Sequence, residues 1–237
     1  MRCLFIADAH LRDPQESHYR KLLRLLQTLD DDPGELFFMG DTFDFWMGYR
    51  HTVFAPYVPF LERLRQLRER EIPITLLEGN HDFLLGPYFD ELGCTVLPAN
   101  TMLVRQGKKL LLAHGDLIDE GDVSYRRLRA LLRHPLFYAA FRIFPPDWAW
   151  RIAEKAAERS KKNREKKGWI HRDPRPLLRE HARRHFTQGV EAVITGHFHF
   201  SWREDTEEGV ILSLGDWRKQ STYAVLENGL LKVETMA

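Results

Sequence analysis

Cysteine is scarce in this sequence, and long apolar runs are missing. The 237 residues include two cysteines, Cys3 and Cys94, which excludes a disulfide framework and fits a reducing cytosol. No stretch approaches the roughly 18 consecutive apolar residues of a membrane-spanning helix. The chain opens directly on Met-Arg and an apolar run, without the layout of a signal peptide. We therefore expect a soluble protein that contacts a membrane at its surface at most.

A net charge of one sign is also lacking. The chain has 35 Lys and Arg against 34 Asp and Glu, so the whole molecule is not a generic polyanion binder. The charge is unevenly spread, however, because residues 120–190 hold 18 Lys and Arg against 8 Asp and Glu. The length and the 43% hydrophobic content fit a single domain over 1–237 with an embedded subdomain.

Apolar runs of strand length alternate with segments of helical spacing, which predicts a mixed α/β fold. Helices are expected over 17–30 and 54–70. Strands are expected at 2–7, 35–39, 73–77, 94–97, 101–105, 109–113, 192–195, 210–214 and 223–226. Between 121 and 186 helical spacing dominates and aromatic residues are interleaved, which indicates an inserted helical segment.

Five of the expected strands end in turns that carry Asp, His or Asn. The side chains are Asp8, His10, Asp41, Asn80, His114, His197 and His199. Each fragment alone is weak, since Gly and Asp also suit ordinary turns. In layered α/β folds, however, ligands gather at the carboxyl ends of strands. Five such ends in one chain predict that these seven side chains form one site.

The residue types suit a pair of metal ions. Carboxylate, imidazole and amide donors together favour Mn²⁺, Fe²⁺ or Zn²⁺ over Ca²⁺, and the lack of thiolates excludes a cysteine-rich structural zinc site. One carboxylate flanked by ligands on both sides predicts two ions about 3.5–4 Å apart. Such a pair lowers the pKa of a bridging water, so that hydroxide attacks phosphorus in line. The sequence therefore predicts a metal-dependent phosphoesterase.

The motifs in this order resemble the calcineurin-like metallophosphoesterase superfamily. They are Asp8-Ala-His10, Gly40-Asp41, Gly79-Asn80-His81-Asp82, His114-Gly115-Asp116 and Gly196-His197-Phe198-His199. The resemblance implies a β-sandwich flanked by helices. It also implies one metal at Asp8, His10, Asp41 and His199, and a second at Asp41, Asn80, His114 and His197, with Asp41 bridging. Catalytic roles would fall on Asp41, Asn80, His81 and His114.

Further segments resemble the UDP-2,3-diacylglucosamine hydrolase family. They are Gly40-Asp41-Thr42-Phe43-Asp44, Asp82-Phe83-Leu84-Leu85-Gly86, Gly93-Cys94 and Leu214-Gly215-Asp216-Trp217. This resemblance implies Mn²⁺ and cleavage of a nucleotide-sugar lipid at its α-phosphate, which gives UMP and 2,3-diacylglucosamine 1-phosphate (lipid X) for lipid A. It implies a cytoplasmic monomer that does not act on nucleic acid, and leaves open a peripheral contact with the inner membrane.

The same resemblance implies that residues 121–186 form a helical lid over the metals. Substrate contacts would fall on Asn80, His81, Asp122, Ser160, Arg164, Lys167 and His197. Residues 136–144 are apolar almost all round, and Trp148 and Trp150 follow. Two interpretations stay open: a helical hairpin that buries its own aromatics, or an acyl-chain groove with an interfacial face. The basic run 159–167 is either a solvated helix face or a device that steers pyrophosphate.

One residue departs from the narrower family, because His81 stands where that family usually has Arg. Histidine is the superfamily's general choice, and it can protonate a leaving oxygen or stabilise the transition state. The alternatives are a divergent hydrolase of the lipid and a paralogue that cleaves another phosphodiester or nucleotide. A nuclease would use the basic insert with its aromatics, although residues 136–144 are too apolar for that role. A non-catalytic scaffold would tolerate missing ligands, yet all seven positions are filled.

Overall fold

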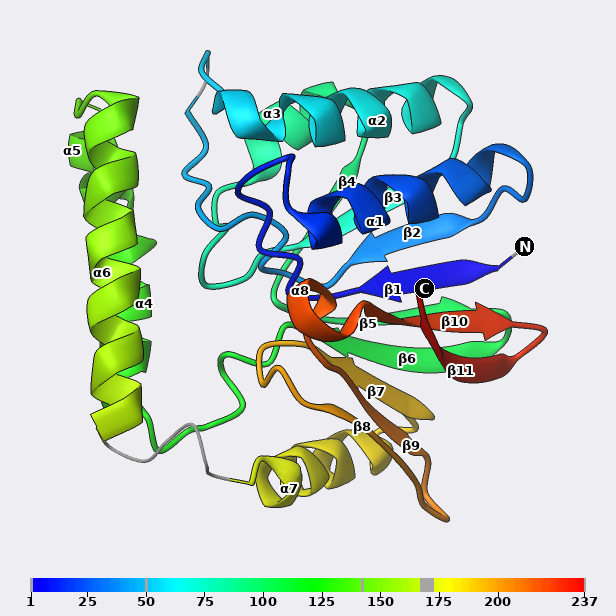
Figure 1. Ribbon diagram of the computed structural model, residues 1–237. Helices are drawn as coiled ribbons and strands as arrows, with labels where there is room; N and C mark the ends of the chain where they lie inside the picture. The colour runs from blue at the N-terminus through cyan, green and yellow to red at the C-terminus, as the bar shows by residue number, and fades with distance from the viewer. Residues whose placement is uncertain (1, 50, 142, 167–172, 237) are drawn as a thin grey trace.

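Two β-sheets lie face to face in the computed structural model, which describes residues 2–49, 51–141, 143–166 and 173–236, without the side chains of 138, 140, 141, 156–158 and 160–166 (Figure 1). The first sheet has the order β11 (Leu230–Thr235), β10 (Thr222–Glu227), β1 (Cys3–Ile6), β2 (Glu35–Phe38), β3 (Ile74–Leu77), β4 (Thr95–Leu97). The second has the order β5 (Asn100–Arg105), β6 (Lys108–Ala113), β7 (Ala192–Thr195), β9 (Val210–Leu214), β8 (Ser201–Asp205).

The central strands are apolar throughout because both of their faces are covered. In β1, Cys3 and Phe5 face the second sheet, whereas Leu4 and Ile6 face helices on the outside. The ring of Phe5 stacks on that of Phe37 in β2, with centroids 4.7 Å apart, and this pair lies in the core between the sheets. The alternation follows from the two-residue period of a strand.

Helices cover the outer face of each sheet. Helices α1 (Ser17–Gln27) and α2 (Val58–Glu69) pack on the first sheet, and α7 (Arg175–Phe186) packs on the second. Short helices complete the body: η1 (Thr28–Asp30), η2 (Ala55–Tyr57), α3 (Gly86–Glu91) and α8 (Trp217–Gln220). The expected β-sandwich flanked by helices is thus confirmed. The strand at β8 and the helix at α3 were not predicted, because their short sequences show little periodicity.

Parallel pairing brings the functional turns to one edge. Strands β1, β2 and β3 are adjacent and parallel in the first sheet, as are β6 and β7 in the second. The turns after these strands are joined by backbone hydrogen bonds, such as those from the His10 amide to the Asp41 carbonyl and from the Gly196 amide to the His114 carbonyl, both 2.9 Å. The carboxyl ends of five strands therefore meet at the same end of the sandwich.

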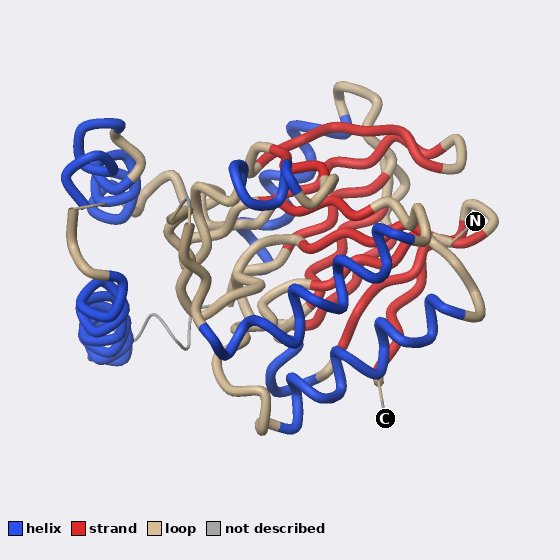
Figure 2. The backbone as a smooth tube through the Cα atoms, turned by 90° about the horizontal axis from the view of Figure 1, so that it is seen from above, coloured by secondary structure: helices blue, strands red, loops and turns tan. Residues whose placement is uncertain are grey.

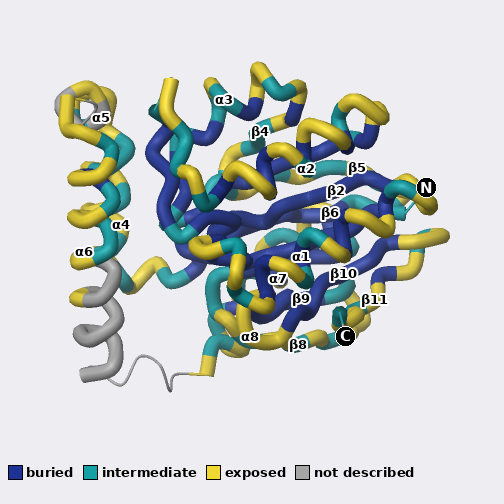
Figure 3. The backbone as a smooth tube through the Cα atoms, turned by 45° about the horizontal axis from the view of Figure 1, so that its top comes forward, coloured by how far each residue is buried: buried dark blue, intermediate teal, exposed yellow. Residues whose placement is uncertain are grey.

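Helices α4 (Val123–Leu132), α5 (Pro135–Phe141) and α6 (Pro146–Lys166), which we call the insert helices, stand beside that end of the body (Figures 1 and 2). They are far less buried than the strands (Figure 3). Their apolar contacts with the body include a small cluster in which Ala149 packs among Phe45, Met47 and Phe83, and Trp150 also packs against the main core. Within the expected insert 121–186, α7 is part of the layer that covers the second sheet, and α4–α6 alone stand apart.

The two tryptophans of α6 have different environments. Trp150 packs on the body, with its ring centroid 4.7 Å from that of Phe54, whereas Trp148 is 60% exposed. Among the described contacts, Trp150 is thus covered by aromatic residues of the body and not by the insert's own, whereas Trp148 fits the interpretation as an exposed apolar face. Within the described ranges, no helix has both the length and the apolar character needed to span a membrane.

Candidate metal centre

The structure brings all seven predicted ligands together at the edge where five strands end. Asp8 and His10 follow β1, Asp41 follows β2, Asn80 follows β3, His114 follows β6, and His197 and His199 follow β7. Ligand atoms of Asp8, His10 and His199 lie within 4.8 Å of one another, and so do those of Asp41, His114 and His197. Asn80 joins the second set, because its Oδ1 is 3.2 Å from His114 Nε2. The donors thus form two adjoining sets.

Asp41 lies between the two sets. Its Oδ2 is 3.8 Å from His10 Nε2, and its Oδ1 is 3.5 Å from His114 Nε2. The two carboxylate oxygens therefore face different groups of imidazoles. This is the geometry expected of a bridging ligand in a two-metal site.

Five of the seven ligands have left-handed backbone conformations. The φ angles are 53° for Asp8, 44° for His10, 50° for Asp41, 68° for His197 and 52° for His199. Residues other than glycine rarely adopt such angles, and strained residues of this kind gather at functional sites. The turns thus hold their ligands in conformations that sequence periodicity does not reveal.

Two glycines leave room for these turns. A Cβ atom on Gly40, whose φ is +92°, would collide with the ring of His114, and one on Gly79 would collide with the Asp41 carboxylate. Glycine is therefore required beside the ligands of the second set because any side chain would occupy the space that ligand atoms fill.

The imidazoles are oriented by hydrogen bonds on the nitrogen that faces away from the centre. His114 Nδ1 donates to the Met39 carbonyl at 2.9 Å, and His199 Nδ1 donates to Asp216 Oδ2 at 3.0 Å. Each bond fixes the proton on Nδ1 and leaves the Nε2 lone pair toward the centre, as in metal-binding histidines. Burial lowers the pKa of His10 to about 3 and that of His197 to about 3, so both rings are neutral at neutral pH.

The buried carboxylates also fit a cation. Asp8 Oδ1 is buried and has no hydrogen-bond partner among the described residues, while Oδ2 accepts the His197 amide at 2.8 Å. Burial, followed by the neighbouring Asp41 charge, raises the pKa of Asp8 well above its ordinary value. Adjacent buried carboxylates beside neutral imidazoles form a donor set suited to divalent cations.

Asp82, which sequence analysis did not single out as a site residue, organises two of the ligand turns. Its carboxylate accepts the amides of Gly79 and Asp41, both at 2.9 Å, and those of Thr42 at 2.6 Å and Phe43 at 3.2 Å. The side chain is fully buried. The signal that could have revealed it is its position two residues after Asn80, where an Asp can close a turn onto its own backbone.

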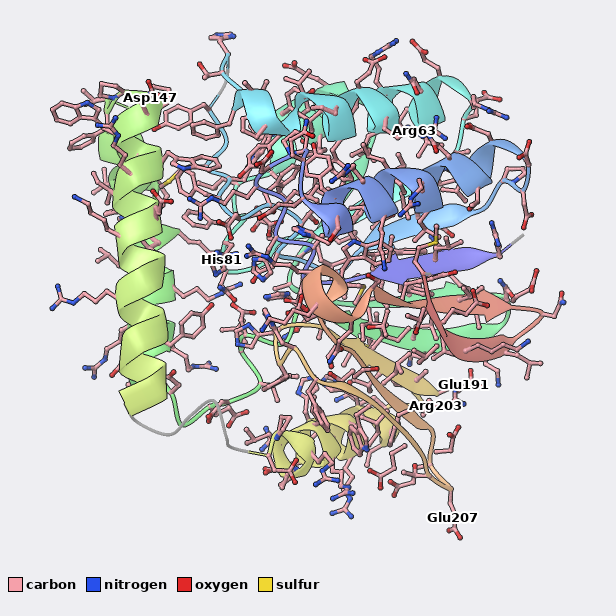
Figure 4. All side chains as sticks on the ribbon, viewed as in Figure 1. Arg63, His81, Asp147, Glu191, Arg203 and Glu207 are labelled. Atoms are coloured by element: carbon pink, nitrogen blue, oxygen red, sulfur yellow. The ribbon has the colours of Figure 1, made fainter. Side chains whose placement is uncertain are left out.

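His81 is held at the face of the body that points toward α6 (Figure 4). Its Nδ1 donates to the Asp44 carbonyl at 2.9 Å, and its backbone amide donates to Asp41 Oδ1 at 2.9 Å. The ring lies edge-to-face on that of His10, with centroids 4.9 Å apart. Because Nδ1 is bound to a carbonyl, Nε2 is the ring atom that His81 can offer to a substrate.

The predicted substrate contacts on the insert are less defined. Asp122 is the N-cap residue directly before α4, and its Oδ1 accepts the Tyr125 amide at 3.0 Å, so the carboxylate caps this helix. Ser160 and Arg164 lie in α6, in a part whose side chains are outside the described set. Lys167 lies outside the described residues altogether. Their contact with substrate stays a prediction.

Comparison with known proteins decides the family, because residues 1–201 match the sequence model of the calcineurin-like phosphoesterase family. The chain belongs to the calcineurin-like phosphoesterase family. This phosphoesterase shares its fold with a novel archaeal phosphodiesterase, at a TM-score of 0.52 and 12% identity over 99% of both chains. The corresponding values for Yfce, a phosphoesterase from E. coli, are 0.50 and 16%, over 100% of this chain and 93% of that one.

The phosphoesterase also resembles curated relatives along nearly its whole length. It is 31% identical over 235 residues to UDP-2,3-diacylglucosamine hydrolase of Pseudomonas paraeruginosa, over 93% of this chain and 92% of the relative. It is 29% identical over 258 residues to the hydrolase of that name from Porphyromonas gingivalis, over 98% and 96%. The family and these relatives establish a metal-dependent phosphoester hydrolase.

Proposed function

We propose that this phosphoesterase hydrolyses UDP-2,3-diacylglucosamine to UMP and 2,3-diacylglucosamine 1-phosphate in lipid A biosynthesis. The observation that carries the proposal is the pair of donor sets that share Asp41, placed at the edge that faces a basic insert with exposed apolar residues. Relatives named for this activity align over nearly the full length of the chain. The cleaved bond would be the pyrophosphate bond at the α-phosphate.

Two divalent ions, which we assign as Mn²⁺, would be held by the seven ligands with Asp41 between them. When bound, such a pair would lower the pKa of water, which makes it a better nucleophile, and would polarise the phosphoryl group as a Lewis acid. The chain's own residues orient this chemistry: Asn80 and His114 hold the second set, and His197 also borders the substrate. His81 Nε2 is assigned to the leaving oxygen, where a positioned imidazole contributes general acid catalysis.

The insert would bind the lipid part of the substrate. Among the described residues, its exposed apolar side chains are Val123, Leu128, Leu131, Leu136, Ile143, Phe144, Trp148 and Ile152. Ile143 is 84% exposed and Trp148 is 60% exposed, although folding normally buries side chains of this size. An amphipathic substrate and the membrane that contains it both match such a surface. We therefore propose a cytoplasmic monomer that contacts the inner membrane peripherally through the insert and does not act on nucleic acid.

Replacing Ile143 and Trp148 together by Ser is expected to weaken binding to vesicles of phosphatidylethanolamine and phosphatidylglycerol by about tenfold or more. Each side chain contributes about 1.5–3 kcal/mol when it leaves water, and tenfold corresponds to about 1.4 kcal/mol. Co-sedimentation measures the effect. The control is Leu230→Ser, at a 62% exposed position on β11. Equal sedimentation of the double variant and the unaltered protein would contradict membrane contact through these residues.

Hydrolysis of UDP-2,3-diacylglucosamine with Mn²⁺, beside the generic diester bis-p-nitrophenyl phosphate, tests the function directly. We expect fast release of UMP from the lipid, and loss of both activities after chelation until metal is returned. Cleavage of the generic diester alone would keep the metal centre and overturn the lipid assignment. That result would favour the second candidate function, a paralogue that cleaves another phosphodiester or nucleotide. The observation that supports this candidate is His81, which stands where the narrower family usually has Arg.

A further inference from the structure

Helix α4 and Arg133, the residue that follows it, present three polar side chains to the body at intervals of four residues. Tyr125, Arg129 and Arg133 are half-buried, whereas Arg126, Arg127 and Leu128 on the other faces are exposed. Residues four apart in a helix lie on the same face, one turn above another. We call Tyr125, Arg129 and Arg133 the strap residues.

Two strap residues bind the turn that carries His114. Asp116 lies two residues after this ligand, and its side chain is 1% exposed. Asp116 Oδ2 accepts the Tyr125 hydroxyl at 2.5 Å and Arg129 Nε at 2.7 Å. A buried carboxylate needs such partners, since leaving it unpaired is costly. The position of the His114 turn is therefore linked to α4.

The third strap residue binds the turn that carries Asn80. Arg133 Nη2 donates to the Gly79 carbonyl at 2.9 Å and lies 3.5 Å from Glu78 Oε2. Its guanidinium also lies 5.2 Å from the ring centroid of Phe83. Arg133 thus contacts the turn on both sides of Asn80, through the residue before it and through Phe83 after it.

Among the described residues, the remaining ion pair between the insert helices and the body is of a weaker kind, and Arg126 Nη1 adds a hydrogen bond to the Leu117 carbonyl at 3.1 Å. Arg12 pairs with Glu154 of α6, but these side chains are 43% and 34% exposed. Those of Arg129 and Asp116 are 16% and 1% exposed. Exposed ion pairs contribute little to stability, whereas breaking a buried pair is costly. The less exposed polar contacts that attach the insert to the body therefore come from the strap residues. These contacts bind the two turns that carry His114 and Asn80.

We propose that Tyr125, Arg129 and Arg133 are positioning residues that fix the Asn80 and His114 turns, so that the insert supports the second metal set as well as covering the site. Because these side chains hold two ligand turns in one arrangement, docking of α4 and metal affinity are coupled, and each strengthens the other. The proposal holds for any phosphodiester substrate, since it concerns the ligand turns alone.

Arg133→Met tests the proposal. It keeps an unbranched apolar stem but removes the donors to Gly79 and Glu78. We expect Mn²⁺ binding, measured by calorimetry on the metal-free protein, to weaken by about 10–100-fold. The kcat for bis-p-nitrophenyl phosphate should fall by a similar factor at saturating Mn²⁺, with KM little changed, because a misplaced turn affects the reaction more than the binding of a small ester. Arg133→Lys keeps one donor and should recover part of the loss.

Arg127→Met is the matched control, since it removes the same charge from an exposed position of the same helix. It should leave Mn²⁺ affinity and kcat unchanged. Tyr125→Phe removes a single hydroxyl and should weaken Mn²⁺ binding several-fold even if Arg133→Met fails to fold. The proposal is overturned if Arg133→Met and Tyr125→Phe both bind Mn²⁺ and cleave bis-p-nitrophenyl phosphate like the unaltered protein. A loss confined to the lipid substrate would instead make Arg133 a substrate-binding residue.

Discussion

Asp41→Asn is expected to lower kcat by about a thousandfold or more, the largest effect that we predict for one conservative substitution. The amide keeps the shape of the side chain and an oxygen for the His81 amide, but it removes the charge that faces both donor sets. A two-metal site depends on such a shared anion to hold its ions close together. Turnover of bis-p-nitrophenyl phosphate at saturating Mn²⁺ measures the loss.

The same substitution should not destabilise the metal-free protein. Asp41 is buried beside Asp8, and its charge helps to raise the pKa of Asp8. Removing one of two neighbouring buried carboxylates relieves repulsion with Asp8. Burial opposes the Asp41 charge, but the neighbouring His114, His81 and His10 outweigh it and lower the pKa of Asp41, so the variant also loses a favoured charge and its Tm without metal should change little. Asp31→Asn, at an exposed position, is the control for charge alone. Near-normal turnover by Asp41→Asn would refute the two-metal assignment.

Asp82→Ala should have the largest effect on stability, a decrease of at least about 3 kcal/mol in the free energy of unfolding. The carboxylate accepts four backbone amides. The Gly79 amide also donates to the Asp82 backbone carbonyl at 3.2 Å, but each of the three others would be left without a partner, at a cost of about 1–3 kcal/mol. Urea unfolding of the metal-free protein measures this change. Because two of the amides belong to Gly79 and Asp41, Mn²⁺ affinity should fall as well.

The matched control is Asp90→Ala, which removes a carboxylate from an exposed position in α3. It should change the free energy of unfolding by less than about 0.5 kcal/mol. If Asp82→Ala is no less stable than this control, water has replaced the carboxylate at little cost, and Asp82 does not organise the turns.

The candidate ligands at the strand ends could be predicted from the sequence because metal chemistry restricts residue types. Few side chains can replace Asp41 or His114 at a strand end, so their pattern is visible without coordinates. The helix and strand periods were equally visible, since they follow from burial on fixed faces. A mixed α/β fold and the edge where the ligands meet followed from these two signals, whereas the β-sandwich followed from the family resemblance alone.

The supporting contacts could not be predicted in the same way. Asp82 closes turns across 40 residues of sequence, and Arg133 reaches Gly79 across 54. Such contacts depend on how the turns and α4 are placed in space, and a charged residue on a helix is usually a solvated one. The different environments of Trp148 and Trp150 are likewise set by how α6 lies on the body. From the composition of this segment alone, the same environment was expected for both tryptophans.

The origin of the ligands in two different sheets has a mechanical consequence. Asp8, His10, Asp41 and Asn80 come from one sheet, and His114, His197 and His199 come from the other. Ions shared between these groups would join the sheets at one end of the sandwich as a cross-link does. A slide of one sheet over the other by a single residue would separate ligands from both sets at once. The apolar core between the two sheets prevents that slide. It therefore also keeps the ligands of the two sheets at the relative positions that the metal centre needs.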